Sequence, residues 1–377
     1  MFEVNRAKKF KIVFCSQKPE DLSTGGVRQI ADVIRYFDKS GICVQFLDRK
    51  PRFNGIISDV LKNFWYISKF LKIKEENIIV VEPNSERYSF FLFNIFISIF
   101  LRKKFHLVGI VQAFYHSYRT SFIKNWMDRL LSYLFLQGLN LIITSGKSAQ
   151  DELVKMGVPA SKINNVYLAT REEFAKNVES NSHNNTSKKI LFAGRLHPVK
   201  GVEYLIEAIN ILKDRDIKLF VVGDFEENIE YSRKIFEMVR RFGIGDKIEF
   251  IGRIFDDWRL AEFYRSSDIL VLPSVWDTSP ITLVEAMCFG LPIVASKVGG
   301  IPEYVEDGVN GILVHPKDSQ ELAKAISLLI DNCDLREELS KGSFRKSFEY
   351  RNRTWEDVGK EYYQILSGLW KRQGEDG

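Results

Sequence analysis

The stretch from Leu272 to Glu303 reads LPSVWDTSPITLVEAMCFGLPIVASKVGGIPE. It begins at the last residue of one short apolar strand, Ile269 to Leu272, and it contains a second such strand, Ile293 to Ala295. Between the two, Ser279-Pro280 is typical of a helix start, because serine caps free backbone amides and proline suits the first helical turn. The stretch therefore predicts a strand, a helix from Ile281 to Cys288 and a second strand, which is the βαβ unit of a parallel sheet.

The same alternation of strands and helix-length segments extends in both directions from this unit. Further strands are expected at Phe10 to Cys15, Cys43 to Leu47, Ile78 to Val81, Leu107 to Val111, Leu141 to Thr144, Ile190 to Ala193, Leu219 to Val222 and Ile248 to Ile251. Strands that alternate with helices predict the α/β class, with parallel sheets covered by helices.

A polar stretch divides this alternation into two halves. Residues 175–189 read AKNVESNSHNNTSKK, with almost no apolar anchor and no helical or strand period, as is typical of a linker. We expect one α/β domain over residues 1–175, a linker over 176–189 and a second α/β domain over 190–350. Residues 351–377 carry aromatic and aliphatic side chains at helical spacing and are expected to form a C-terminal helix.

Length and composition exclude several classes of protein. With 377 residues, 45% of them hydrophobic and 27% charged, the chain can bury two or three cores and is not a disordered, collagenous or coiled-coil protein. Its four cysteines contain no C-x-x-C pair, which argues against a zinc cluster and a dense disulfide framework. No secretory signal is apparent, and the most apolar run, Phe90 to Leu101, is too short to span a membrane. We expect a cytoplasmic protein.

Charge is distributed unevenly. Residues 1–170 hold 25 lysines and arginines against 14 acids, whereas the remainder holds 29 against 35. A basic half indicates an anionic partner or surface, and we expect no nucleic-acid partner. Lys62 to Lys74 and Phe90 to Lys104 combine basic with apolar and aromatic residues, as helices at a membrane interface do. Ordinary helices that cover a sheet and expose their lysines have the same pattern, so both interpretations stay open.

Three loops that follow strands carry residues suited to an anion. Arg195 and Lys200, in LFAGRLHPVKG, are close enough along one loop to bind a single diphosphate, the arginine as a fork and the lysine as a point charge. Gly25-Gly26 opens the first helix and lets backbone amides approach a phosphate, without forming the G-x-G-x-x-G pattern of a dinucleotide oxidoreductase. Gly299-Gly300 is a second such pair. A solvated basic loop and plain tight turns are the alternatives.

The helix start at Ser279-Pro280 is itself expected to bind an anion. It leaves three backbone amides unpaired and favourable to negative charge, those of Ile281, Thr282 and Leu283. Glu285, about one turn inside, leans towards the helix N-terminus and can accept hydrogen bonds from two hydroxyls of a polyol. Asp277 precedes the same helix end, so two carboxylates flank one phosphate-sized site. Taken singly, each acid is consistent with an ordinary surface charge.

These residues resemble those of retaining glycosyltransferases of family 4. Residues 190–314 contain GRL…KG, an acidic pair at E-x7-E spacing, GLPIVAS and GGIPEYVEDGVNGILV in the family's order, and the resemblance covers most of the chain. It implies the GT-B fold, in which two Rossmann-like parallel-sheet domains face each other across a cleft that holds a nucleotide-sugar. Residues 1–175 would form the acceptor side, residues 190–350 would bind the donor, and residues 351–377 would return to pack on the first domain.

The resemblance also implies how the donor is held. Arg195 and Lys200 would bind its diphosphate and Glu285 its ribose. The pair Gly25-Gly26 would lie near the phosphates from the opposite domain. The backbone around Arg253-Ile254, after the strand Ile248 to Ile251, is where the family seats the base.

Two features concern the transferred sugar and the end of the first domain. His116, in VQAFYHSYRT, resembles the histidine that the family places beside the sugar, and a hydrogen-bonded loop histidine is the alternative. Asp277 would orient the sugar with it, but it stands where the family usually has glutamate, so its carboxylate reaches one methylene less far. Ala169-Thr170-Arg171 replaces the N-G-V or N-G-I that commonly follows the last strand of the first domain, which predicts a differently shaped loop there.

The expected reaction is transfer of a hexose from a nucleoside diphosphate sugar to an acceptor hydroxyl, with retention at the anomeric carbon. The cations and amides named above would stabilise the leaving diphosphate. The resemblance implies front-face attack in which the departing phosphate helps to take the acceptor's proton. We expect no metal or other cofactor, because the cations and helix dipoles would already neutralise the charge of the diphosphate. A glycan or lipid-linked cell-envelope acceptor, met at the inner face of the membrane by the basic half, fits polysaccharide or glycolipid synthesis. A nucleotide-sugar epimerase and a non-catalytic partner subunit are the alternatives.

Overall fold

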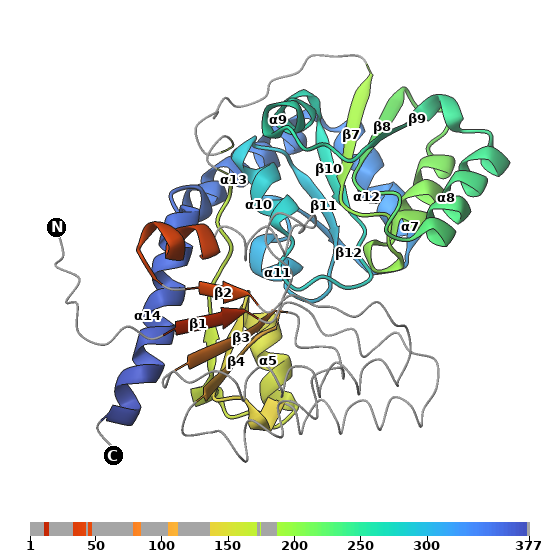
Figure 1. The fold of residues 1–377 in the computed structure, drawn as a ribbon. Coiled ribbons are helices and arrows are strands. Elements are labelled where there is room, and N and C mark those ends of the chain that lie inside the picture. Colours follow the sequence, from red (N-terminus) through yellow and green to blue (C-terminus); the bar gives the residue numbers. More distant parts are fainter. Residues whose placement is uncertain are drawn as a thin grey trace. The chain divides into compact units, whose positions relative to one another are not determined.

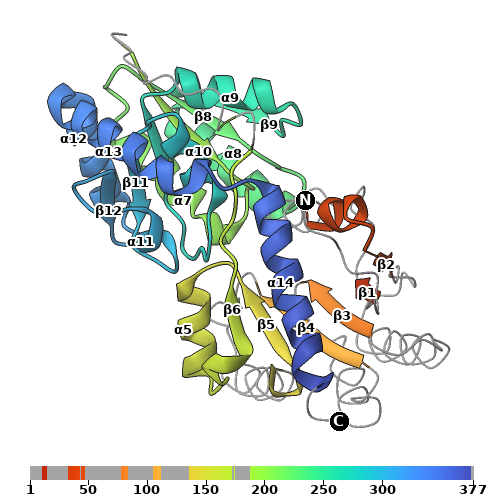
Figure 2. The same cartoon turned by 90° about the vertical axis from the view of Figure 1, so that its left-hand side faces the viewer.

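The computed structural model describes residues 11–14, 33–42, 44–46, 78–83, 105–111, 136–171, 174 and 187–374. The chain divides into two compact units, drawn in Figure 1 and, turned by 90°, in Figure 2. Unit 1 comprises Met1–Leu168 together with Trp355–Gly377, and unit 2 comprises Ala169–Thr354. None of the described helices combines the length and the apolar character needed to cross a bilayer.

Unit 1 contains a parallel sheet of six strands in the order β2-β1-β3-β4-β5-β6. The strands are β1 (Lys11–Phe14), β2 (Val44–Phe46), β3 (Ile78–Pro83), β4 (Phe105–Val111), β5 (Leu141–Thr144) and β6 (Ile163–Asn165). The first five confirm strands that the sequence predicts. The sixth was not predicted, because three residues of which two are asparagine give no period-2 apolar pattern.

Helices from both ends of the chain belong to unit 1. They are a helix over residues 33–39, α5 (Lys147–Lys155), the short 3-10 helix η4 (Ala160–Lys162) and α14 (Trp355–Gly374). The α14 helix lies against the helix at 33–39, since a Cβ added at Gly359 would come within 2.4 Å of the Tyr36 side chain. Val358 and Tyr362 of α14 are buried. The last helix of the chain thus contributes apolar side chains to the core of unit 1.

Unit 2 contains a second parallel sheet of six strands, in the order β12-β11-β10-β7-β8-β9. The strands are β7 (Lys188–Ala193), β8 (Ile217–Val222), β9 (Ile248–Gly252), β10 (Ile269–Leu272), β11 (Ile293–Ser296) and β12 (Gly311–Val314). Every residue of β10 and β11 is buried, without alternation. Such continuous burial is typical of central strands in a parallel sheet that is covered on both faces.

Helices cover both faces of the unit 2 sheet. They are η5 (Pro198–Lys200), α7 (Val202–Ile211), α8 (Ile229–Phe242), η6 (Gly245–Lys247), α9 (Asp257–Ser266), α10 (Ile281–Cys288), α11 (Ile301–Tyr304), α12 (Ser319–Asp331) and α13 (Cys333–Arg351). The α7 helix packs against α8 and α12, and α10 packs against α13 (Figure 1). Because right-handed crossovers leave β7 and β10 in opposite directions along the sheet, α7 and α10 lie on opposite faces.

Two predicted boundaries are wrong. The linker over 176–189 ends too late, because Lys188 and Lys189 pair with β8 as part of β7; residues 175–186 lie outside the described residues. The first domain was expected to reach residue 175, but the chain belongs to unit 2 from Ala169 onwards. The physical reason is the aromatic packing of Phe174, whose ring centroid lies 5.5 Å from that of Tyr264 and 5.1 Å from that of Phe289.

Candidate functional site

The two loops that carry most of the predicted site leave neighbouring strands in the middle of the unit 2 sheet. β7 lies between β8 and β10, and the connections that leave β7 and β10 run in opposite directions. Ligands of such sheets bind at the carboxyl ends of the strands where the direction reverses. The loop 194–201 after β7 and the loop 273–280 after β10 both begin at this reversal point. The fold therefore brings together two motifs that are far apart in the sequence.

The two loops are joined through their backbones. The amides of Val275 and Trp276 donate to the Val199 carbonyl over 2.8 Å and 3.3 Å. Gly201 has a φ of +64°, and a Cβ there would lie 2.1 Å from the Pro273 carbonyl oxygen. A larger residue at this position would both strain the backbone and push the loops apart. The glycine that ends the predicted diphosphate-binding loop is thus needed for its contact with the second loop.

An ion pair between Lys200 and Asp277 also links the loops. The two side chains are 17% and 11% exposed, so both charges are held largely out of water. A lysine ammonium has three donors, and one of them meets the carboxylate. The lysine can therefore hold Asp277 and an anionic ligand at the same time.

Arg195 has a different acidic partner. It pairs with Glu227, which follows β8, and both side chains are about one-third exposed. Between the two cations, the Nδ1 of His197 accepts a hydrogen bond from the Val199 amide over 3.2 Å and caps η5. Burial lowers the pKa of His197, and the charge of Arg195 lowers it further. Each predicted diphosphate cation thus pairs with its own carboxylate, while His197 has a structural role as the cap of η5.

The α10 helix has the predicted bounds, Ile281 to Cys288, but its capping residue differs from the prediction. Pro280, with a ψ of 102°, is the N-cap residue and lies outside the helix. Ser279 does not cap the helix; its Oγ lies 2.7 Å from the Tyr304 hydroxyl. The amide of Leu283 is not unpaired, because it donates to the Pro280 carbonyl over 3.0 Å. Ile281 and Thr282 remain as first helical residues whose amides have no preceding helical carbonyl to bond.

The glycine pair after β11 has a structural role that the sequence did not reveal. The amide of Gly300 donates to the Asp277 carbonyl over 2.9 Å. A Cβ at Gly299 would lie 2.0 Å from the Asp277 carbonyl oxygen, and one at Gly300 would lie 1.9 Å from that of Thr278. The expectation that both amides face a ligand is therefore wrong for Gly300. The pair instead lets the β11 loop pack on the backbone of Asp277 and Thr278.

Glu285, one turn inside α10, lies in a buried network. The residue is 3% exposed, and its two carboxylate oxygens have different partners. Oε1 accepts a hydrogen bond from the Nε of Arg171 over 2.8 Å, and Oε2 accepts one from the Tyr264 hydroxyl over 2.7 Å. Arg171 also pairs with Asp257, the first residue of α9. Two acids and one cation therefore share this part of unit 2.

The sequence did not reveal this network. Burial lowers the pKa of Arg171, but the charges of Glu285 and Asp257 outweigh burial and hold the pKa above its usual value. Burial raises the pKa of Tyr264 well above its usual range, and the charge of Glu285 adds to the increase. The only signal in the sequence was the departure at Ala169-Thr170-Arg171 from the family's pattern. It marked a loop of different shape but gave no partner, because 114 residues separate Arg171 from Glu285.

Arg253 and Ile254, predicted to lie beside the base, follow β9. The Nη1 of Arg253 lies 3.6 Å from the Oδ2 of Asp224, and its Cζ lies 4.6 Å from the centroid of the Phe255 ring. Ile254 packs against the core of unit 2, whereas Phe255 is 78% exposed. An exposed ring beside an arginine at this edge offers a face on which a planar group can stack.

Polar atoms without a hydrogen-bond partner gather on one loop. Within the described part of the chain, three buried side-chain atoms have no such partner: Ser274 Oγ, Trp276 Nε1 and Thr278 Oγ1. All three belong to the loop between β10 and α10. Because buried polar groups are nearly always hydrogen-bonded, this loop is where polar groups of a ligand or ordered water would complete the structure.

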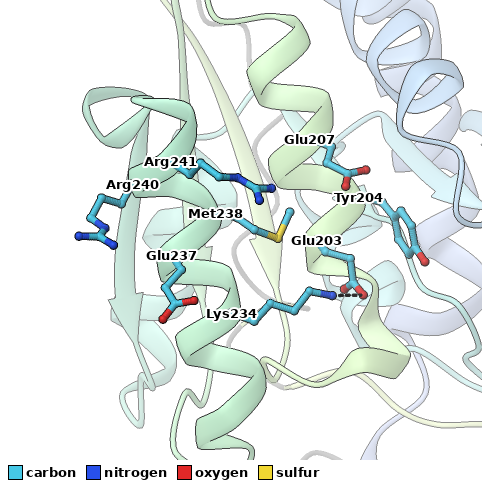
Figure 3. A pocket seen from close by; sticks show the side chains of 8 residues that line it. All are labelled: Glu203, Tyr204, Glu207, Lys234, Glu237, Met238, Arg240 and Arg241. Carbon is cyan, nitrogen blue, oxygen red and sulfur yellow. Dashed lines mark ion pairs between the residues drawn. The ribbon is translucent and has the colours of Figure 1, made fainter.

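A surface cavity of about 780 Å³ lies elsewhere on unit 2, between α7 and α8. Figure 3 shows its lining: Glu203, Tyr204, Glu207, Lys234, Glu237, Met238, Arg240 and Arg241. The side chain of Lys234 reaches from α8 towards α7, and its Nζ lies 3.6 Å from the Oε1 of Glu203. None of the residues predicted from the sequence lines this cavity. Gly25, Gly26 and His116 lie outside the described residues.

Comparison with known proteins agrees with the motifs. Residues 173–346 match the family model for glycosyl transferases group 1. An uncharacterized glycosyltransferase of Methanocaldococcus jannaschii is 31% identical over 238 residues, which are 59% of this chain and 59% of that protein. One of Haemophilus influenzae is 28% identical over 357 residues, covering 87% of this chain and 93% of that protein.

The fold has close structural counterparts. The crystal structure of Anabaena HepE in complex with UDP-glucose superposes with a TM-score of 0.71 at 18% identity, covering 95% of this chain and 99% of that one. The two Rossmann-like parallel sheets of the present chain are those of a GT-B protein, as the sequence predicts. Residues 173–346, which are most of unit 2, are thus similar to the glycosyl transferases group 1 family.

Proposed function

We propose that the protein is a retaining hexosyltransferase that moves a sugar from a nucleoside diphosphate sugar to an acceptor hydroxyl. The observation that carries the proposal is the convergence of Lys200, Asp277 and the first turn of α10 at the reversal point of the unit 2 sheet. A cation, an acid and free helix amides within one loop pair suit a sugar joined to a phosphate. The similarity of residues 173–346 to the glycosyl transferases group 1 family supports the same reaction class.

The diphosphate would lie between the loop after β7 and the start of α10. Lys200 would donate to it while keeping Asp277, and the amides of Ile281 and Thr282 would donate from the helix end. Arg195 would leave Glu227 or bridge it to the second phosphate; its exposure of about one-third gives it room to move. Charge grows on this group as the glycosidic bond breaks, so fixed cations and dipoles lower the barrier.

Two further groups of residues would hold the nucleoside next to the diphosphate. Glu285 would accept hydrogen bonds from the ribose hydroxyls, and the backbone at Arg253-Ile254 would contact the base, with Phe255 nearby. UDP-glucose bound to HepE, a protein of the same fold, is consistent with a uridine nucleotide as one candidate donor. The sugar would face Asp277.

Chemistry at the anomeric carbon needs no protein nucleophile in this scheme. The bond between the anomeric carbon and the phosphate oxygen breaks with its electron pair going to the phosphate. The acceptor oxygen bonds to the same face of that carbon, and its proton passes to the departing phosphate. Because Lys200, Arg195 and the helix amides already balance the charge, we propose that turnover is independent of a divalent metal.

The acceptor class follows from the charge of the first half. Residues 1–170 hold 25 basic residues against 14 acidic ones, and this basic excess favours an anionic acceptor. The acceptor that we propose is a lipid-linked glycan at the inner face of the membrane. Vesicles with and without anionic lipid test this part separately from the donor reaction.

The donor reaction is tested in two steps. Thermal unfolding with UDP, GDP and ADP identifies the nucleotide, since bound ligand raises the midpoint by mass action. The matching nucleotide-sugar is then incubated with and without an acceptor glycan, and the anomeric configuration of the product is determined by NMR. Retained configuration in a glycosylated acceptor supports the proposal. Conversion of the nucleotide-sugar without acceptor would identify an epimerase, and binding without any turnover would identify a non-catalytic subunit.

A further inference from the structure

Arg171 lies two residues inside unit 2, directly after the chain leaves unit 1. Its side chain is 17% exposed and connects two helices of unit 2, through Asp257 on α9 and Glu285 on α10. Its Cζ also lies 5.4 Å from the ring centroid of Phe174. The guanidinium is therefore held in one orientation by two ion pairs and an aromatic ring.

The carboxylate of Glu285 is held from two sides. Oε1 accepts from the Nε of Arg171, and Oε2 accepts from the hydroxyl of Tyr264, which is itself fully buried and stacked on Phe289. A carboxylate oxygen can accept two hydrogen bonds. Each oxygen of Glu285 thus has one fixed donor and one remaining acceptor position. Both remaining positions have a defined direction, because neither fixed donor can rotate freely.

We propose that Arg171 is a positioning residue for the nucleotide: together with Tyr264, it presents the two remaining acceptor positions of Glu285 to a pair of adjacent hydroxyls, and it thereby sets a preference for ribose over deoxyribose. The inference rests on the proposed function, since it assigns Glu285 to the ribose of the donor. The inference gives Arg171, which lies outside the family's motifs, a role in the nucleotide specificity of the site. A vicinal diol matches a carboxylate whose two oxygens each have one free acceptor position.

Removal of the guanidinium should loosen the carboxylate without removing it. Glu285 would then keep only Tyr264 as a partner and could turn towards whichever donor remained. Loss of one ribose hydroxyl would cost less in such a site, because a mobile carboxylate bonds the remaining hydroxyl as well. The measured quantity is therefore the affinity ratio between a nucleoside diphosphate and its 2′-deoxy or 3′-deoxy counterpart.

The experiment measures these ratios by calorimetry in the full-length chain, with the nucleoside diphosphate found to bind it. We expect the unmodified protein to bind the ribonucleotide about tenfold more tightly than the deoxynucleotide, as for loss of one hydrogen bond to a charged group. In Arg171→Met the ratio should fall to about threefold or less, and Arg171→Lys should restore part of it. The control is Arg215→Met, which removes another arginine–carboxylate pair of unit 2, that with Asp331, and should leave the ratio unchanged.

The outcomes separate this inference from the proposed function. Binding of a nucleoside diphosphate with the same ratio in Arg171→Met and in the unmodified protein would overturn the positioning role alone. Absence of nucleoside diphosphate binding by the unmodified protein would overturn the proposed function and this inference with it. If Arg171→Met fails to fold, Tyr264→Phe decides the question, because it removes the other fixed donor and keeps the buried ring. The ratio should fall in that variant also, and an unchanged ratio there would overturn the inference.

Discussion

The ammonium of Lys200 and the carboxylate of Asp277 form an ion pair between the loops that leave β7 and β10, 77 residues apart in the sequence. The pair is mostly buried and lies directly before the first turn of α10. Removal of one partner would leave the other charge without its counterion in a largely desolvated position. Stability and turnover are therefore coupled at this point, and variants here must be measured for both.

Asp277→Ala should lower turnover by about 10²–10³-fold, the usual effect of removing one electrostatic contact to a reacting group. Asp277→Glu keeps the carboxylate and should retain most of the activity. Initial rates of sugar transfer with the donor at saturation check both. Asp268→Asn is the control, because Asp268 is a buried acid that lies 3.8 Å from Lys188 and outside the site. It should lose stability and keep its turnover number, and equal turnover in all four proteins would remove Asp277 from the reaction.

Arg195→Ala should weaken binding of the nucleoside diphosphate by more than ~1.5 kcal/mol, since a hydrogen bond to a charged group contributes about that much. The free energy of unfolding should change little, because the pair with Glu227 is about one-third exposed and exposed pairs contribute less than ~1 kcal/mol. Calorimetric titration gives the affinity and urea unfolding the stability. Arg215→Ala, at a more exposed arginine–carboxylate pair of unit 2, that with Asp331, is the control. An unchanged affinity in Arg195→Ala would exclude a contact with the diphosphate.

Gly300→Ala should lower the free energy of unfolding by more than ~2 kcal/mol, because the added methyl group would lie 1.9 Å from the Thr278 carbonyl oxygen. The φ of Gly300 is −86°, so the cost is steric and does not come from backbone strain. Gly245→Ala is the matched control: a Cβ there meets no atom within 4 Å, and its stability should change by less than ~0.5 kcal/mol. Chemical unfolding of both variants measures the difference. Equal stability of both would contradict the close packing of the β11 loop on Thr278.

Thr278→Val should have opposite effects on the free and the bound protein. The Thr278 Oγ1 is buried without a hydrogen-bond partner in the described part of the chain, so an apolar side chain of the same shape should raise the free energy of unfolding by up to ~1 kcal/mol. If the hydroxyl binds the donor, the stabilisation that nucleotide-sugar produces should become smaller in the same variant. Thermal unfolding with and without nucleotide-sugar measures both. A variant that gains stability and responds to donor like the parent would show that this hydroxyl does not contact the donor.

The stability of the protein should fall as the pH decreases below about 6.5, the ordinary pKa of histidine. Burial lowers the pKa of His197 in the folded protein, so between its folded and unfolded pKa values the unfolded chain binds more protons. Stability in this window therefore rises with pH. His197→Asn can keep a side-chain cap on η5 without a titrating group, and it should reduce the slope. Urea unfolding between pH 5 and pH 7.5 gives both slopes, and identical slopes would show that His197 does not contribute.

The sequence alone predicted the fold class because it depends on local patterns. Strands such as β5 and β10 are short apolar runs between polar segments, and their limits follow from the chain itself. The motifs around Arg195 and Asp277 each follow a strand, and in a parallel sheet the carboxyl ends of strands share one edge. Their convergence could therefore be predicted, although no local pattern indicated that Lys200 rather than Arg195 pairs with Asp277.

Other features depend on contacts between distant segments. Serine followed by proline is a helix start by local preference, yet the fold gives Ser279 a partner in Tyr304 and moves the N-cap to Pro280. A glycine pair has no side chain, so nothing in the sequence showed that Gly299 and Gly300 serve to fit against the backbone of Asp277 and Thr278.

The partners of Glu285 show the same limit most clearly. The sequence determined that a carboxylate lies one turn inside a helix that begins after a strand, because helical periodicity and the strand pattern are encoded locally. Only the tertiary structure decided that Arg171 and Tyr264 hold that carboxylate. Arg171 reaches it from the segment at the start of unit 2, and Tyr264 reaches it from α9. Side-chain pairing across 114 residues is fixed by how the sheet and its helices pack, and this packing leaves no periodic signal in the chain.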